Sequence, residues 1–174
     1  MTSWPGAPLA AAVELLALEG RGASGVFRLG ARTVVVRRGR IAAVSGRAGI
    51  DASLHDFLVA AGRLGDTGRA RLAAAGLGGE ALEAAVVGGD AAAAERSDLR
   101  METLRESLRS AWMERLARTF AEEGGELSLA REPSPPTIAE GGYDVSSLAL
   151  VLDALERCAS GATRRPWVSG RRSG

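Results

Sequence analysis

The sequence predicts an α+β fold, in which a small antiparallel meander sheet packs with several helices, one of them long. The first observation is a series of three runs of β-branched and apolar residues, at 26–29, 33–36 and 39–44. Short connections at 30–32 and 37–39 contain the glycines that tight hairpin turns use at positive φ. The second observation is helical periodicity on both sides of this region. Together they predict three consecutive strands, to which a late fourth strand adds.

Helical patterns flank the predicted meander. Apolar residues at helical spacing predict a first helix over residues 9–18, which ends before Gly20. After the strands, steps of three and four residues between apolar positions predict a second helix. Asp51 or Gly49 begins this helix, and Gly62 ends it.

The middle of the chain predicts two short helices and one long one. The short helices cover residues 68–75 and 79–87, and the alanine-rich stretch at 90–95 is either a linker or the lead-in to the next helix. The longest helix extends over residues 98–122, with an apolar stripe on one side and charged residues on the other. An alternating strand at 126–129 then makes the sheet four-stranded.

The C-terminal part predicts a linker, a last helix and a tail. Asp144 is the expected N-cap of a helix, whose apolar face consists of Val145, Leu148, Val151, Leu152 and Leu155. Such a face needs a partner surface, so we expect the helix to fold back onto the core. The expected organisation is an α+β domain at 1–130, a Pro/Gly linker at 131–142, a docking amphipathic helix at 143–159 and a disordered tail at 160–174.

The composition favours a cytoplasmic setting and makes a nucleic-acid partner unlikely. The chain has 174 residues, and 22 basic against 21 acidic residues give it a net charge of +1. Phosphate binding normally shows as a basic excess. All basic residues are arginine, and lysine, asparagine and glutamine are missing, which indicates a biased genome composition. Cys158 is the only cysteine, which suits a reducing compartment. Neither a signal peptide nor a membrane span is expected, because the apolar stretch at 9–18 is short.

No motif assembles a reaction centre. The glycine spacing at residues 20–25 resembles a dinucleotide-binding turn, but a helix precedes it and a strand follows, which reverses the required context. A Walker loop needs a lysine, which the chain lacks. His55 is the only histidine, and we interpret it as a surface or half-buried helix residue, and Cys158 as a small hydrophobe. The expectation is therefore a protein that is not an enzyme, with no catalytic, cofactor or metal residues.

Arg37, Arg38, Arg40 and Trp112 are the candidate residues of a protein interface. The three arginines form the one basic cluster, at the second predicted hairpin, where they could grip an acidic partner or remain a solvated turn. Trp112 lies on the long helix, where it is either a core residue or an interface anchor if that face is incompletely covered.

A family resemblance covers residues 9–158. The residues that carry it are, in order, Leu15-Leu16, 24–29, 34–36, 39–43, Leu54, Phe57, Leu58, 125–129 and 146–155. In this order they resemble the bacterial PATAN domain family, which is found alone or joined to response-regulator receiver domains. Leu127 and Leu129 stand where the family usually has aromatic residues, and no receiver domain is present.

The resemblance implies a non-catalytic signalling adaptor that binds other proteins, in some relatives the motility machinery or a small GTPase. It assigns no catalytic residue. The first hypothesis is therefore a protein-interaction module in signal transduction, with a homodimer through an edge strand or the long helix as a further expectation. The alternative is a regulator that binds a small ligand or nucleic acid through the hairpin at Arg37–Arg40.

Overall fold

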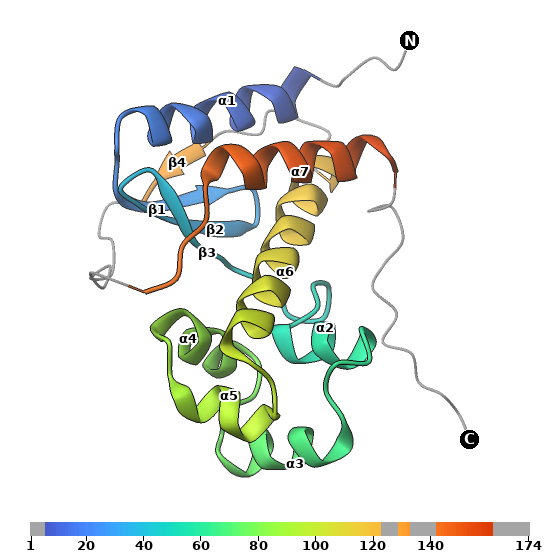
Figure 1. Ribbon diagram of the computed structural model, residues 1–174. Helices are drawn as coiled ribbons and strands as arrows, with labels where there is room; N and C mark the ends of the chain where they lie inside the picture. Colours follow the sequence, from blue (N-terminus) through green and yellow to red (C-terminus); the bar gives the residue numbers. More distant parts are fainter. Residues whose placement is uncertain (1–5, 123–128, 133–141, 162–174) are drawn as a thin grey trace. The chain divides into compact units, whose positions relative to one another are not determined.

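A computed structural model of the protein describes residues 6–122, 129–132 and 142–161. Over these residues the chain forms seven helices and a four-stranded antiparallel sheet. Figure 1 labels these elements. This confirms the predicted α+β fold with its meander, its late fourth strand and its one long helix.

The sheet has the order β3-β2-β1-β4. Its strands are β1 (Gly25–Leu29), β2 (Arg32–Arg37), β3 (Arg40–Val44) and β4 (Leu129–Arg131). In β2, buried residues alternate with half-buried ones, as expected for a strand with one face in the core. The fourth strand was expected at 126–129. Residues 126–128 lie outside the described part, and the described strand continues to Arg131.

The contacts within the fold divide the chain into two compact units. The first contains α1 (Gly6–Gly20), the four strands, α6 (Met101–Glu122) from Trp112 onward, and α7 (Ser147–Ala159). The second contains four short helices and α6 up to Ala111. The predicted domain at 1–130 includes parts of both units, and its bounds stay a prediction.

The first unit buries an apolar core between its helices and the sheet. Trp112 is its largest fully buried side chain, with 1% of its surface exposed. Helices α1 and α7 lie side by side in Figure 1 and contact each other. Two arginines join α6 to the sheet from the inside. Arg32 donates hydrogen bonds to Thr119 and Glu122, and Arg115 donates one to the carbonyl of Val44.

The short helices of the second unit are α2 (Leu54–Ala60), α3 (Asp66–Ala74), α4 (Glu80–Gly88) and α5 (Ala91–Ser97). The expected start of α2 at Gly49 or Asp51 is wrong. Ser53 is its N-cap, because its hydroxyl and the Asp56 carboxylate form a complete capping box. The stretch at 90–95 is neither linker nor lead-in but most of a separate helix, which Asp90 caps.

The expected start of the last helix is also wrong. Ser146 caps α7 by accepting a hydrogen bond from the amide of Ala149, so Asp144 is not the N-cap. The expected apolar stripe is only partly right. Leu150 and Ala154 are buried, whereas Leu148 and Leu152 are about half exposed. The predicted linker and tail lie mostly outside the described residues.

Candidate functional site

The β2–β3 hairpin turns at Arg38 and Gly39, and both residues have positive φ, 50° and 79°. Two such residues between paired strands form the turn that matches the twist of a hairpin. The turn packs directly against the end of α1. A Cβ atom on Gly39 would lie 2.6 Å from the Cα of Glu19, and the Gly39 amide donates to the carbonyl of Ala23. The predicted basic cluster is therefore held in a fixed position.

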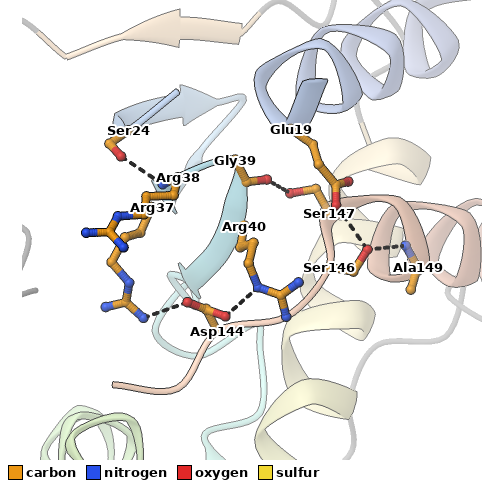
Figure 2. A network of polar contacts seen from close by, with 10 residues as sticks. All are labelled: Glu19, Ser24, Arg37, Arg38, Gly39, Arg40, Asp144, Ser146, Ser147 and Ala149. Carbon is orange, nitrogen blue, oxygen red and sulfur yellow. Dashed lines mark hydrogen bonds and ion pairs between the residues drawn. The ribbon is translucent and has the colours of Figure 1, made fainter. Parts of the chain in front are cut away.

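Asp144 lies between two of the clustered arginines, as Figure 2 shows. Its Oδ1 accepts a hydrogen bond from Arg40 Nε at 2.6 Å, and its Oδ2 accepts one from Arg37 Nη2 at 3.0 Å. Burial raises the pKa of the Asp144 carboxyl. The hydrogen bonds from Arg40 and Arg37 and their positive charges lower it by more, so the pKa lies below the ordinary value of 3.8.

The residues that follow Asp144 attach the start of α7 to the same hairpin. Val145 forms a β-bridge with Ile41, through two backbone hydrogen bonds of 2.9 and 3.0 Å. The buried hydroxyl of Ser147 donates to the carbonyl of Gly39 at 2.6 Å. The carboxylate of Glu19 accepts hydrogen bonds from Ser146 Oγ and from the Leu148 amide. We call this set of contacts the hairpin clamp.

The hairpin clamp changes the interpretation of the predicted interface residues. Arg37 and Arg40 are not merely solvated turn charges, because both bind Asp144, and only 12% of the Arg37 side chain is exposed. Arg38 is exposed. Trp112 is a core residue, and its burial removes it as an anchor that a partner could reach in this conformation.

The other residues that the sequence analysis discussed lie in ordinary structural positions. The glycine-spaced segment 20–25 lies where a turn was expected, with residues 21–24 between the end of α1 and the start of β1. His55 is half-buried on α2, with its Nδ1 atom 3.8 Å from a carboxylate oxygen of Asp56, and Cys158 is half-buried near the end of α7. Within the described residues, no three His, Cys, Asp or Glu side chains are grouped so that they could hold a metal ion. No helix there is long and apolar enough to cross a membrane.

Sequence reasoning missed Asp144 as the partner of the arginines and Ser24 as a neighbour of the hairpin. The Ser24 hydroxyl accepts a hydrogen bond from the Arg38 amide at 2.8 Å, and the Ser24 carbonyl accepts one from Arg131 Nη2 at 3.3 Å. Asp144 lies 104 residues after Arg40, so no local pattern links the two. The only signal for Asp144 in the sequence is its position, a carboxylate just before an apolar helix. The same position predicts an N-cap just as well as an ion-pair partner.

The fold and the site together define an α+β protein whose C-terminal helix is clamped to a β-hairpin by a carboxylate between two guanidinium groups. Comparison of the chain with protein-family models, with curated proteins and with solved structures finds no match. The resemblance to PATAN domains therefore stays a prediction.

We expect replacement of Asp144 by Asn to lower the free energy of unfolding by about 1 kcal/mol at neutral pH, because two partly exposed charged hydrogen bonds weaken. The folded-state pKa of Asp144 is depressed, so its stabilising effect is present above the unfolded pKa and is lost as the pH falls through the folded one. The difference between wild type and variant should therefore shrink below about pH 4.

Urea unfolding of both proteins across this pH range measures the effect. Glu156 is an exposed carboxylate on the same helix, so Glu156→Gln is the matched control and should give no comparable difference. A difference between wild type and the Asp144 variant that stays constant down to about pH 3 would contradict the ionised clamp.

Proposed function

We propose that the protein is a non-catalytic interaction adaptor in signal transduction. The observation that carries this proposal is the exposure of large apolar side chains on two helices that contact each other. Leu9 and Val13 of α1 are 51% and 57% exposed, and Leu148 and Leu152 of α7 are 49% and 52% exposed. Exposed apolar side chains that gather on neighbouring elements are typical of protein-binding surfaces, because association removes them from water.

The hairpin clamp supports this role for α7. Ser147 and Asp144 fix the first turn of the helix to the hairpin, so Leu148 and Leu152 are presented from an element that is already ordered. A partner that binds there does not have to order α7, which lowers the cost of association.

The PATAN resemblance adds the classes of partner. It favours a response regulator, a small GTPase or the motility machinery, in the cytoplasm, and a second copy of the chain is a further candidate. The alternative regulator that binds nucleic acid or a small ligand through Arg37–Arg40 loses support, because Asp144 already binds Arg37 and Arg40.

The test is affinity capture from the cells that make the protein, with partners quantified by mass spectrometry. We expect Leu148→Ser combined with Leu152→Ser to lower the recovery of specific partners at least about tenfold, since each buried interface leucine contributes on the order of 1 kcal/mol or more. Both positions are half exposed, so thermal stability should change little.

The matched control replaces two exposed alanines of the same helix, Ala149→Ser combined with Ala159→Ser. It should leave recovery unchanged. Sedimentation of the purified wild type and of both variants shows whether the partner is a second copy. Equal recovery of every protein by all three chains would refute the proposed surface on α7.

A further inference from the structure

Three segments of the first unit place an arginine residue at the turn between α1 and β1. Arg38 comes from the hairpin turn, and its amide donates to Ser24 Oγ. Arg131 comes from β4 and donates to the Ser24 carbonyl. Arg21 belongs to the turn itself, three residues before Ser24, and its Nε donates to the carbonyl of Ala17 at 3.2 Å. All three residues are exposed. We call Arg21, Arg38 and Arg131 the Ser24 basic surface.

The neighbouring arginines each have a carboxylate partner, whereas those of the Ser24 basic surface have none among the described residues. Arg28 pairs with Glu132 at 2.8 Å, and Arg37 and Arg40 share Asp144. Glu19 uses both carboxylate oxygens on the start of α7. Among the described residues, no carboxylate lies within ion-pair distance of Arg21, Arg38 or Arg131. Within the described part of the chain, the positive charges of this surface are therefore not paired with a carboxylate.

We propose that the Ser24 basic surface binds an acidic segment of a partner protein. The proposal rests on the adaptor function and adds the chemistry of the partner. Guanidinium groups bind carboxylates through two parallel hydrogen bonds, which makes arginine well suited to acidic peptides. The stems of Arg38 and Arg131 start from ordered backbone, since Arg38 is fixed by Ser24 and Arg131 lies opposite Phe27 in the sheet. The backbone of these two residues therefore loses little conformational freedom when a partner binds.

An acidic protein segment fits this surface better than nucleic acid does. Proteins that bind double-stranded DNA tightly typically make about 6–10 phosphate contacts along a continuous basic face. The Ser24 basic surface offers three guanidinium groups, and the carboxylate of Glu132 lies on the neighbouring Arg28. The whole chain has a net charge of only +1. Short-range pairing with a few carboxylates suits this arrangement.

The test measures binding of a fluorescein-labelled hexaglutamate peptide to the full-length chain by fluorescence anisotropy, at low ionic strength. Hexaglutamine is the uncharged probe, and a labelled DNA duplex is the nucleic-acid probe. We expect the affinity for hexaglutamate to fall about threefold in Arg38→Gln and about tenfold or more when Arg21 and Arg131 are also changed to Gln. Raising the salt concentration should weaken the binding of hexaglutamate.

The matched control is Arg28→Gln combined with Glu132→Gln, which removes an arginine together with its carboxylate partner and leaves the net charge unchanged. Its affinity for hexaglutamate should stay within about twofold of wild type. The proposal is overturned if hexaglutamate binds no better than hexaglutamine, if the Arg28 and Glu132 double variant weakens binding as much as Arg38→Gln, or if the DNA duplex binds more tightly than the peptide. Circular dichroism verifies that each variant is folded.

These results are independent of the capture experiment on α7. If the acidic partner is wrong but the adaptor function is right, Leu148 and Leu152 still govern the recovery of partners while the arginine variants do not affect it. If the adaptor function is wrong, no partner depends on Leu148 or Leu152, whatever the peptide does.

Discussion

A chain that ends at Tyr143 should lose at least about 5 kcal/mol of its free energy of unfolding. Five buried apolar side chains of the described residues go with the deleted segment, namely Val145, Leu150, Val151, Ala154 and Leu155, and the larger ones each contribute about 1.5–3 kcal/mol. The Asp144 ion pairs and the Ser147 hydrogen bond are lost as well. This sum is comparable to the whole stability of a typical domain. We therefore expect the first unit to unfold at or near room temperature.

Ending the chain at Tyr143 keeps the contacts of that residue in the second unit. Its amide donates to the carbonyl of Val87, and its ring lies 5.3 Å from the guanidinium carbon of Arg105. The control is a chain that ends at Gly161, which retains α7 and the hairpin clamp. Thermal unfolding by far-ultraviolet circular dichroism compares the two with the full chain. A melting temperature of the Tyr143 chain within about 5 °C of wild type would show that α7 is not part of the core.

Replacement of Gly39 by Ala should cost about 3 kcal/mol or more, the largest effect that we expect from adding one methyl group. The residue has a φ of 79°, where a Cβ atom is strained. The new methyl group would also lie 2.6 Å from Glu19 Cα and 2.8 Å from its carbonyl oxygen. These are backbone atoms, so a side-chain rotation cannot relieve the overlap. The hairpin must move away from α1, which also disturbs the contact of Ser147 with Gly39.

A substitution at a second glycine, Gly22, distinguishes the cost of backbone strain from the cost of steric overlap. Gly22 has a φ of 59°, and a Cβ atom there would meet nothing within 4 Å. Gly22→Ala should therefore cost only about 1 kcal/mol, from the strained backbone alone. Urea unfolding of both variants gives the difference. If Gly39→Ala is no more destabilising than Gly22→Ala, then the hairpin and α1 are packed less closely than the structure indicates.

The two effects concern the same place in the molecule. Glu19, Gly39 and Ser147 meet where α1, the hairpin turn and the start of α7 join. A change at any of them should alter both the stability of the first unit and the presentation of Leu148 on α7. Interface variants are therefore best made at Arg38 or Leu152, which are exposed.

Local patterns were enough to predict much of the fold. The strands at 26–29, 33–36 and 39–44 and the hairpin turn at Gly39 follow from runs of β-branched and apolar residues and from glycine at positive φ. The long helix follows from its periodic apolar stripe. The residues that form each of these patterns lie close together in the chain, so the sequence alone is enough to recognise them.

Only the tertiary structure decided the roles of the charged and capping residues. Ser146, not Asp144, caps α7, because the helix begins at Ser147. The Asp144 carboxylate instead binds Arg37 and Arg40 across more than 100 residues of sequence. Arg38, unlike Arg37 and Arg40, does not bind Asp144, and its amide donates to Ser24 instead. Trp112 is buried because packing covers its face of α6. Charge pairing and burial depend on which distant segments come together, and the spacing of residues along the chain does not determine that.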